Sequence, residues 1–538
     1  MELDSGREAS IGQLPWEWVD RGDAGRHAVV DGLTALSYAE LAYRVDAVAD
    51  AFLTAGLRQG DSMLIQLPNC WEFIVTTLAC QRIGVATVFA LMPHRIHELT
   101  GIIRRMPVHA VAVVDRWGDF DHRALVDQAF GPQASTLVVA VVGESVAATD
   151  IDIRACAANT VDRPARRIRL DSADIAPWSV ATVLLTSGST GESKLVPHTH
   201  IEHIHAFRSC GDVCGLTVDT RYLAVLPVAH NFSLASPGIL GVLDAGGTVI
   251  LARSPNPQHA LPLLERESAT MTAIVPAIAQ RWLACIDDPA MPALDLSTLS
   301  LVQIGGAITP PRLAAQLAER LSVAVQQVYG MSEGLICLTR PDDPYEIAHH
   351  TQGRPASPFD EVRVIDAAGN DARVGEVGEL VTKGRSLFEG YVGQPLSRVS
   401  GDRDDGWHRT GDLVRLHSSG NIVVVGRIKE SINRGGEKIS PTEVEAAARD
   451  MPGVGDVVAF AWPDDELGEI VGAAIIVEKG HTEPTIADLE RHFARFGLAH
   501  YKVPGVVFYV DEFAVTSVGK VDRLRTRDGL LSRSDARC

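Results

Sequence analysis

A glycine- and hydroxyl-rich segment directly after an apolar run constrains this chain more than any other feature. The apolar run is Val-Leu-Leu at 183–185, which we expect to be a buried strand. Small residues fill the next six positions, and Lys194 follows three residues after the last of them. Glycines let backbone N–H groups converge on an anion, while hydroxyls and a lysine add donors and positive charge. We therefore expect a phosphate-binding loop that consists of Thr186, Ser187, Gly188, Ser189, Thr190, Gly191 and Lys194.

The spacing within this loop differs from that of the common P-loop. A P-loop places its lysine directly after the last glycine, whereas Glu192 and Ser193 intervene here. A flexible surface turn is the other interpretation of a segment rich in glycine and serine. The run of small residues between a strand and a lysine favours phosphate binding over that alternative.

Length and charge limit the kinds of protein that this chain can be. Its 538 residues exceed what one compact core normally holds, so we expect two or more domains. The net charge of −19 argues against a general nucleic-acid or anionic-membrane binder, although a single nucleotide needs only a local site. The first residues lack a basic start followed by an apolar run, and no stretch approaches the ~20 apolar residues of a membrane span. We therefore expect a cytoplasmic protein without nucleic-acid or membrane partners.

Helix-like and strand-like segments alternate over the first part of the chain. Residues 35–56 have apolar positions at helical spacing and end at a glycine, and 63–69 form a short apolar run. After about residue 355 short β-like runs dominate, and 443–450 is helix-like again. The pattern predicts an α/β fold, with a large N-terminal domain of layered sheets at 1–427 and a small C-terminal α+β domain at 428–538.

Further short segments follow the loop in a fixed order. They are Gly305-Gly306-Ala307, Tyr329-Gly330-Met331-Ser332-Glu333, Arg409-Thr410-Gly411-Asp412-Leu413, Arg434-Gly435-Gly436-Glu437-Lys438-Ile439 and Val518-Gly519-Lys520-Val521. Each alone is a weak signal, since turns of this kind are common on protein surfaces. Together with the loop they resemble the adenylate-forming superfamily, which contains acyl- and aryl-CoA synthetases, adenylation domains of nonribosomal peptide synthetases and beetle luciferases. The resemblance extends from about residue 30 to about residue 525.

The resemblance assigns a role to each segment. It implies the adenylate-forming enzyme fold, and it implies ATP and Mg²⁺ as cofactors. Glu333 would ligate the metal, because a carboxylate suits this hard cation. Tyr329 would stack on the adenine, and Asp412 and Arg427 would contact the ribose. The expected adenine and ribose site comprises Gly305, Gly306, Ala307, Tyr329, Gly330, Ser332, Asp412 and Arg427.

The implied reaction joins a carboxylate to AMP and releases pyrophosphate. Catalysis of this kind rests on positioning and charge stabilisation, and Lys520 would bridge the acid's carboxylate and the α-phosphate. In the family the small domain then rotates about a hinge, and a Gly-Gly loop admits a pantetheine thiol. The expected hinge and thiol-acceptor loop comprise Lys429, Gly435, Gly436 and Lys438.

The segment at 230–232 bears on which acid is activated. Amino-acid-activating relatives carry an aspartate at the position of Asn231, which pairs with the substrate ammonium, and a buried ammonium without such a partner is costly. His-Asn-aromatic resembles instead the stand-alone aryl acid–AMP ligases, whose substrates are hydroxylated benzoic acids. The expected aryl acid pocket comprises His230, Asn231, Phe232, Ser236, Ile336 and Cys337.

Two of these pocket residues favour different ring substituents. Ser236 can hydrogen-bond a 3-hydroxyl, which favours 2,3-dihydroxybenzoate, unless it is simply a helix-start residue. Ile336 is bulkier than the valine usual in dihydroxybenzoate enzymes, which favours salicylate. Ser233, Cys337 and His198 replace the proline, asparagine and arginine usual in the subfamily. A hydroxyanthranilate, a hydroxypicolinate or a methylated salicylate therefore stays open.

The expected function is adenylation of an aryl acid, followed by transfer to the phosphopantetheine thiol of a separate aryl carrier protein. Such a reaction belongs to siderophore or nonribosomal peptide biosynthesis. An aryl-CoA ligase differs only in its thiol acceptor and is the first alternative. An inactive nucleotide-binding relative is the second, and the presence of Lys520, Glu333 and the loop argues against it.

Overall fold

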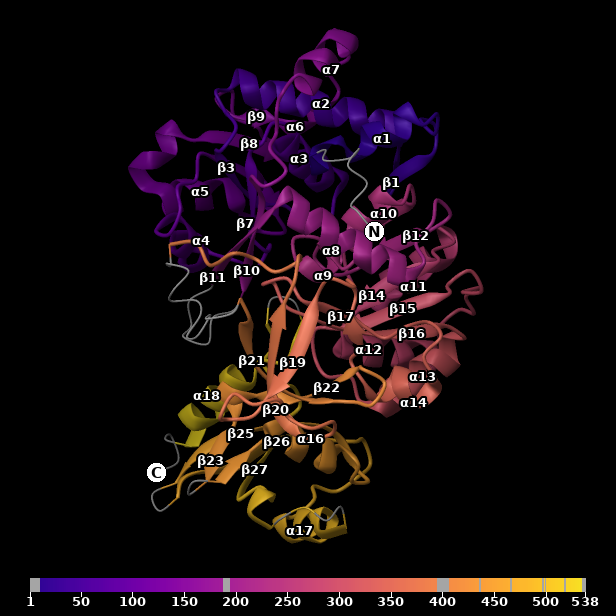
Figure 1. Ribbon diagram of the computed structural model, residues 1–538, viewed down its shortest axis with the longest axis vertical. Coiled ribbons are helices and arrows are strands. Elements are labelled where there is room, and N and C mark those ends of the chain that lie inside the picture. Colours follow the sequence, from indigo (N-terminus) through magenta and orange to yellow (C-terminus); the bar gives the residue numbers. More distant parts are fainter. Residues whose placement is uncertain are drawn as a thin grey trace. The chain divides into compact units, whose positions relative to one another are not determined.

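The chain divides into two compact units (Figure 1). The computed structural model describes residues 10–186, 194–393, 406–434, 437–464, 467–495, 498, 500–516 and 519–534. The first unit comprises 1–349, 354–361 and 383–406, and the second comprises 350–353, 362–382 and 407–538. Large N-terminal and small C-terminal parts of mixed α/β structure confirm the predicted fold class. The position predicted for the domain boundary, after Arg427, lies inside the second unit, where β22 ends.

A seven-stranded sheet forms one layer of the first unit, in the order β11-β10-β4-β3-β5-β8-β9. Its strands are parallel except β11, which runs antiparallel to β10. The strands are β3 (Ser62–Gln66), β4 (Ala86–Phe89), β5 (Ala110–Val114), β8 (Val138–Val142), β9 (Ile151–Asp152), β10 (Val180–Thr186) and β11 (Lys194–Thr199). A small antiparallel pair lies apart from the sheet, β6 (Arg116–Trp117) and β7 (Phe120–Asp121).

Both faces of this sheet are apolar, which explains why its strands are apolar runs rather than alternating ones. Met63 and Ile65 pack into the same core as helices α2 and α3, whereas Leu64 packs on the other side with residues of α4 and α5. Successive residues of a strand point to opposite faces, so one strand contributes side chains to two hydrophobic cores. The helices are α2 (Tyr38–Thr54), α3 (Trp71–Arg82), α4 (Ile96–Ile103) and α5 (His122–Phe130).

Local signals set the start and end of α2. Ser37 accepts a hydrogen bond from the backbone N–H of Glu40, and the Glu40 carboxylate accepts one from the N–H of Ser37. This reciprocal pair is a capping box. Gly56 follows the helix with a φ of +104°, a conformation that glycine adopts at little cost. The helix predicted over 35–56 is therefore confirmed, with its ends a few residues inside that range.

A nine-stranded sheet forms the second layer of the first unit, in the order β18-β17-β16-β15-β14-β12-β13-β1-β2. The strands from β16 to β1 in this order are parallel, and β17, β18 and β2 are antiparallel to their neighbours. The strands are β1 (His27–Asp31), β2 (Thr34–Ser37), β12 (Arg221–Ala224), β13 (Thr248–Leu251), β14 (Met271–Ile274), β15 (Leu301–Gly305), β16 (Ala324–Gly330), β17 (Ile336–Leu338) and β18 (Arg354–Pro355).

Further helices connect and cover the strands of the first unit. They are η1 (Ile11–Gln13), α1 (Leu14–Asp20), η2 (Gly131–Thr136), α6 (Ile153–Ala157), α7 (Arg163–Asp171), α8 (His200–Cys214), α9 (Asn231–Ala235), α10 (Gly238–Asp244), α11 (Pro257–Arg266), α12 (Pro276–Ile286), α13 (Pro311–Leu321) and α14 (Tyr345–His350). Within the described part of the chain, none of the helices has the length and apolarity needed to cross a lipid bilayer.

The second unit contains two sheets. The four-stranded sheet has the order β19-β20-β21-β22, and the other has the order β24-β23-β26-β25 with β27 paired to β26. The strands are β19 (Glu361–Ile365), β20 (Val377–Lys383), β21 (His408–Leu416), β22 (Ile422–Arg427), β23 (Ile432–Arg434), β24 (Glu437–Ile439), β25 (Val454–Asp464), β26 (Gly468–Val477) and β27 (Val506–Tyr509). Its helices are η3 (Ile428–Glu430), α16 (Pro441–Arg449), α17 (Ile486–Arg495), η4 (His500–Lys502) and α18 (Arg523–Ser534).

Helices cover both faces of the sheet that contains β25 and β26. Val457 and Ala473 pack in one core with α16 and α17, whereas Val458 and Ala474 pack on the opposite side with Leu530 of α18. This alternation fixes α18 to the sheet only a few residues after Lys520. The segment that carries the expected catalytic lysine is therefore attached to a packed core at its C-terminal end.

Candidate active site

The expected phosphate loop lies between two antiparallel strands. Thr186, the last residue of β10, pairs with Lys194, the first residue of β11, and the ladder continues to Val180 and Thr199. The predicted loop residues Ser187, Gly188, Ser189, Thr190 and Gly191 lie outside the described residues. A P-loop leads from a strand into a helix, whereas this loop leads into a strand, as its lysine spacing indicated.

Tyr391 lies between Lys194 and Glu333. Its hydroxyl donates a hydrogen bond to Oε1 of Glu333 at 2.5 Å, and Nζ of Lys194 lies over its ring, 4.3 Å from the centroid. Burial and the Glu333 carboxylate both raise the pKa of Tyr391, so the phenol stays protonated and acts as the donor. The backbone N–H of Phe388 also donates to the carbonyl of Glu333 at 2.8 Å. Tyr391 was not predicted from the sequence, because it is 58 residues away from its partner along the chain.

The expected adenine segment and part of the expected aryl pocket face each other across one strand pair. Tyr329 pairs with Cys337, and Gly330 pairs with Ile336, where β16 runs antiparallel to β17. Ile336 and Cys337 are both buried. Burial raises the pKa of the Cys337 thiol, so this residue is a neutral, weakly polar group.

Gly305 lies where the adenine segment approaches the aryl segment. A β-carbon on Gly305 would be 2.6 Å from the carbonyl oxygen of Val328 and 3.3 Å from Cζ of Phe232. A residue with a β-carbon would therefore clash with the backbone at this position. Gly306, which follows it, has a φ of +81° and is exposed together with Ala307.

The other four predicted aryl residues, His230, Asn231, Phe232 and Ser236, belong to the short helix α9 or flank it. Nδ1 of His230 accepts from the backbone N–H of Phe232 at 3.2 Å and caps the helix. Ser236 is buried, and its hydroxyl donates to the carbonyl of Asn231 at 3.4 Å. Ser236 lies at the end of α9 and two residues before the start of α10, and its hydroxyl is directed back toward the asparagine.

Two buried histidines lie against this segment. Nε2 of His198 donates to the carbonyl of Ser332 at 2.6 Å, and the His198 ring stacks on that of His203 with centroids 5.5 Å apart and planes at 11°. Nε2 of His203 lies 3.4 Å from Oδ1 of Asn231. His198 stands out in the sequence as a departure from the subfamily. His203 was not predicted, because helical spacing alone does not distinguish it from a core residue.

The expected ribose residues form an ion pair in the second unit. Asp412 of β21 pairs with Arg427 of β22, and Nε of Arg427 lies 2.7 Å from Oδ1 of Asp412. The carboxylate is buried, whereas the arginine is largely exposed. Asp412 also donates its backbone N–H to the hydroxyl of Thr410 at 3.0 Å.

Lys520 ends a tight turn in the same unit. Its backbone N–H donates to the hydroxyl of Thr516 at 3.1 Å, its carbonyl accepts from the N–H of Thr516 at 2.7 Å, and Gly519 has a φ of +79°. Burial, with a smaller contribution from the positive charge of Arg427, lowers the pKa of Lys520 to about 8. The second unit therefore brings this lysine within the electrostatic influence of the expected ribose pair.

The expected hinge and thiol-acceptor residues are only partly described. Lys429 belongs to η3 and Lys438 to β24, where it pairs with Asn433, and for both residues only the backbone is described. Gly435 and Gly436 lie outside the described residues.

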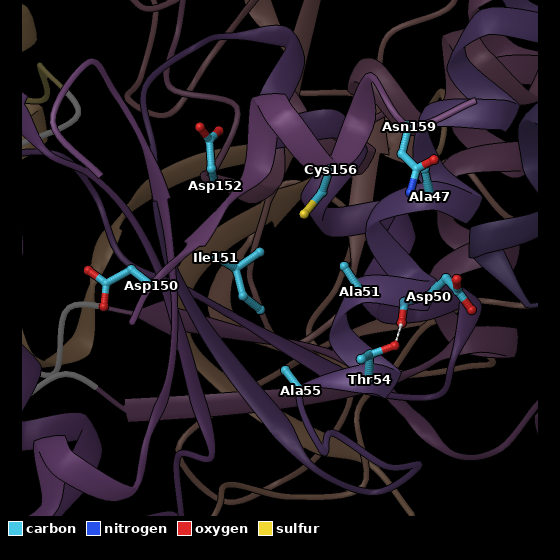
Figure 2. A pocket seen from close by; sticks show the side chains of 10 residues that line it. All are labelled: Ala47, Asp50, Ala51, Thr54, Ala55, Asp150, Ile151, Asp152, Cys156 and Asn159. Carbon is cyan, nitrogen blue, oxygen red and sulfur yellow. Dashed lines mark hydrogen bonds between the residues drawn. The ribbon is translucent and has the colours of Figure 1, made fainter. Parts of the chain in front are cut away.

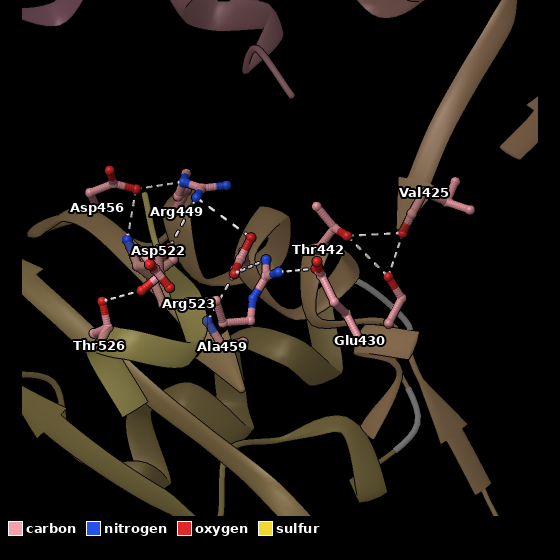
Figure 3. A network of polar contacts seen from close by, with 12 residues as sticks. Val425, Glu430, Thr442, Arg449, Asp456, Ala459, Asp522, Arg523 and Thr526 are labelled. Atoms are coloured by element: carbon pink, nitrogen blue, oxygen red, sulfur yellow. Dashed lines mark hydrogen bonds and ion pairs between the residues drawn. The ribbon is translucent and has the colours of Figure 1, made fainter. Parts of the chain in front are cut away.

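Arg523 ties the segment after Lys520 to the segment around Lys429 (Figure 3). Its guanidinium forms ion pairs with Glu430 of η3 and with the buried Glu445 of α16, the latter at 2.9 Å. Glu445 also accepts from the backbone N–H of Ala459 at 2.9 Å. Arg523 thus joins three elements of the second unit, a role that its position in a charged helix did not indicate.

A separate depression in the first unit contains none of the predicted residues (Figure 2). It is lined by residues of α2, β9 and α6 and their neighbours, with a volume of about 430 Å³. Two of its three carboxylates form ion pairs, Asp50 with Arg169 at 2.9 Å and Asp150 with Arg123 at 2.7 Å, and Asp152 accepts from the backbone N–H of Ala155. Across the described residues, no group of three or more histidine, cysteine or acidic side chains is arranged to hold a metal ion.

The sequence matches two family descriptions in order along the chain. Residues 16–392 match the AMP-binding enzyme family, and residues 443–520 match the AMP-binding enzyme C-terminal domain. The chain belongs to the AMP-binding enzyme family.

Relatives of this AMP-binding enzyme have the names of aryl acid ligases. A Streptomyces protein named salicylyl-CoA synthase / salicylate adenylyltransferase is 44% identical, over 98% of this chain and 95% of the relative. The 2,3-dihydroxybenzoate-AMP ligase of Bacillus subtilis (strain 168) is 39% identical, over 94% of this chain and 91% of the relative. The solved apo structure of Mycobacterium smegmatis MbtA is 32% identical with a TM-score of 0.72, over 97% of this chain and 96% of that one. These matches confirm the predicted resemblance to the adenylate-forming superfamily and its aryl acid–AMP ligases.

Proposed function

We propose that this AMP-binding enzyme activates a benzoic acid with a 2-hydroxyl group, using ATP, and forms its aryl-adenylate with release of pyrophosphate. The observation that carries the choice of acid is the surroundings of Asn231, where the neighbouring polar group is His203 rather than a carboxylate. An amino acid would bring an ammonium group to this position, and a buried ammonium without an anionic partner is strongly disfavoured. The names of the relatives support the same class of acid.

Glu333 is the residue that would hold Mg²⁺. Magnesium in nucleotide sites is usually bound by one or two carboxylates together with phosphate oxygens, and a single partly buried carboxylate fits that requirement. Oε1 of Glu333 accepts from Tyr391, which leaves Oε2 and the remaining lone pairs for a ligand. The metal would neutralise phosphate charge, and Lys194 would add positive charge at the end of the loop.

Lys520 would supply the positive charge at the reacting centre. With a pKa of about 8 it is charged in about nine molecules of ten at pH 7. An ammonium between the acid's carboxylate and the α-phosphate reduces their mutual repulsion and stabilises charge as the new bond forms. Arg427 and Asp412 would hold the ribose of the same nucleotide.

The substituent at ring position 3 depends on Ser236 and Ile336. The Ser236 hydroxyl can turn from the carbonyl of Asn231 to a 3-hydroxyl, which favours 2,3-dihydroxybenzoate. The buried Ile336 takes space on the adjacent strand, and it favours salicylate together with the name of the Streptomyces relative. We place 2,3-dihydroxybenzoate first and salicylate second.

The acceptor would be the phosphopantetheine thiol of an aryl carrier protein, with Lys429 as the hinge and the loop of Gly435, Gly436 and Lys438 as the thiol passage. Free CoA is the second candidate, because the Streptomyces relative is named as a salicylyl-CoA synthase as well as an adenylyltransferase. Because both routes consume ATP, we place the enzyme in the cytoplasm. Thioester formation with holo-carrier protein and with CoA, measured side by side, separates the two candidates.

ATP–pyrophosphate exchange tests the proposal directly. The panel is 2,3-dihydroxybenzoate, salicylate, benzoate, 3-hydroxyanthranilate, 3-hydroxypicolinate and several amino acids. We expect exchange with the 2-hydroxylated acids and its loss, by about 100-fold or more, in Lys520→Ala. Exchange only with amino acids would contradict the role given to Asn231, and no exchange with any acid would favour an inactive nucleotide-binding protein.

A further inference from the structure

We propose that His203 is a positioning residue that fixes the orientation of the Asn231 amide, so that the enzyme selects aryl acids whose ortho substituent accepts a hydrogen bond. The inference rests on the proposed function, because it assigns Asn231 to the ring. It adds to the proposed function a role for His203 and a preference for one kind of ortho substituent.

The two histidines form a rigid support. His203 is 2% exposed and its ring is stacked on His198 with centroids 5.5 Å apart. His198 is 3% exposed and is held by its hydrogen bond of 2.6 Å to the carbonyl of Ser332. His203 lies on α8, whereas Asn231 begins α9, and Nε2 of the histidine faces Oδ1 of the amide at 3.4 Å. Neither ring can turn without losing a contact on its other side.

The protonation of His203 follows from its surroundings. Burial, together with the neighbouring His198, lowers the pKa of His203 to about 3, so the imidazole is neutral and has one N–H group. Nδ1 is buried and has no hydrogen-bond partner among the described residues. A buried N–H without a partner is rarer in proteins than an unpaired acceptor. The hydrogen is therefore on Nε2, which donates to Oδ1 of Asn231.

This donation decides which end of the amide remains for a ligand. An asparagine side chain has one carbonyl acceptor and one NH₂ donor. The carbonyl is engaged by His203, and within the described part of the chain no residue bonds to Nδ2 of Asn231. The group offered to the ring is thus a donor.

A donor at this place discriminates between ortho substituents. The 2-hydroxyl of salicylate donates its hydrogen to the neighbouring carboxylate of the same molecule, so its oxygen offers lone pairs outward. An ortho amino group, as in anthranilate, offers a second N–H and would face the NH₂ of Asn231 donor to donor. Benzoate offers no partner at this position and would leave the Asn231 NH₂ group unpaired against the ring, which should lower kcat/KM by about tenfold. The expected order is salicylate, then benzoate, then anthranilate.

The test compares variants of His203 by kcat/KM in ATP–pyrophosphate exchange with salicylate, benzoate and anthranilate. His203→Phe removes the donor and keeps an aromatic ring against His198, and we expect the ratio of salicylate to anthranilate to fall by about tenfold. His203→Gln restores an N–H donor near the position of Nε2 and should recover most of that ratio. His205→Phe is the matched control, because His205 lies on the same helix and bonds to Ser357 at 2.7 Å instead.

A second variant tests the inference even if His203→Phe does not fold. Asn231→Asp keeps the shape and the bond from His203 but presents an acceptor oxygen to the ring, so the preference should move from salicylate toward anthranilate. An unchanged preference in Asn231→Asp, or an unchanged ratio in a folded His203→Phe, would overturn the inference. If the unmodified enzyme exchanges with no aryl acid at all, the proposed function fails, which is a different outcome from a failure of the His203 assignment alone.

Discussion

Tyr391 and Glu333 form a hydrogen bond of 2.5 Å between a phenol and a carboxylate, and Lys194 lies over the face of the same tyrosine ring. One side chain therefore contacts the residue at the end of the expected phosphate loop and the expected metal ligand. A phenol in this position restrains the carboxylate to one rotamer and leaves the lysine charge over an electron-rich ring.

Substitution of Tyr391 by phenylalanine should weaken Mg²⁺-dependent catalysis while the fold is kept. Loss of the partner that orients a metal-binding carboxylate commonly costs about 10–100-fold in affinity or activity. We expect exchange by Tyr391→Phe to need a higher Mg²⁺ concentration for half-maximal rate. Tyr345→Phe is the control, because Tyr345 is an exposed tyrosine of the same unit. Equal Mg²⁺ dependence in the two variants would contradict the role given to Tyr391.

The charge of Lys520 should determine how adenylation responds to alkaline pH. The amine is protonated below its pKa of about 8 and loses its charge as the pH rises through that value. If the charged form is the active one, kcat/KM for exchange falls above about pH 8, since this parameter reports the free enzyme. The residual activity of Lys520→Arg should not decline above about pH 8, because a guanidinium stays charged. A decline at the same pH in the arginine variant would assign it to another group.

Removal of one partner of a buried ion pair in the first unit should destabilise the protein strongly. Nε of Arg82 lies 3.0 Å from Oδ1 of Asp46, and the two side chains are 1% and 3% exposed. Arg82→Met would leave the Asp46 carboxylate buried without its cation, which typically costs ~3–5 kcal/mol. Urea denaturation should show the loss. Arg116→Met removes a surface partner of Asp121 and should cost less than ~1 kcal/mol. Similar urea denaturation midpoints for the two variants would show that loss of Arg82 costs no more stability than loss of a surface arginine.

Loss of Arg523 should loosen α18 more than it loosens the rest of the second unit. The arginine pairs with Glu430 and with Glu445, and Glu445 is buried. In Arg523→Met we expect amide hydrogen exchange in α18 to speed by about tenfold, which corresponds to ~1.4 kcal/mol. Arg527→Met, on the same helix, removes only a pair with the adjacent Asp528 and should leave exchange in α18 nearly unchanged.

The parts of the fold that sequence could predict are those set by nearby residues. The helix α2 follows from its capping residues and its apolar period, and the strand before the phosphate loop follows from three consecutive apolar residues. The contacts made by Tyr391 and His203 depend on how segments 58 and 28 residues apart pack together. No local sequence pattern predicts contacts between segments so far apart along the chain. Sequence could not predict either that the four-stranded sheet belongs mainly to the second unit, because that assignment depends on contacts rather than on composition.

Gly305 limits the directions in which the aryl site of such an enzyme can diversify. The position has no side chain left to shorten, and the ring of Phe232 already occupies the space beside it. Room for a bicyclic acid would therefore have to come from the larger apolar side chains of the expected pocket, Phe232 and Ile336. A shorter side chain at 232 would also remove support from the strand end that precedes the adenine segment, so a change of acid there would be accompanied by a change in nucleotide affinity. Laboratory evolution toward larger acids should consequently accumulate its first substitutions at Ile336.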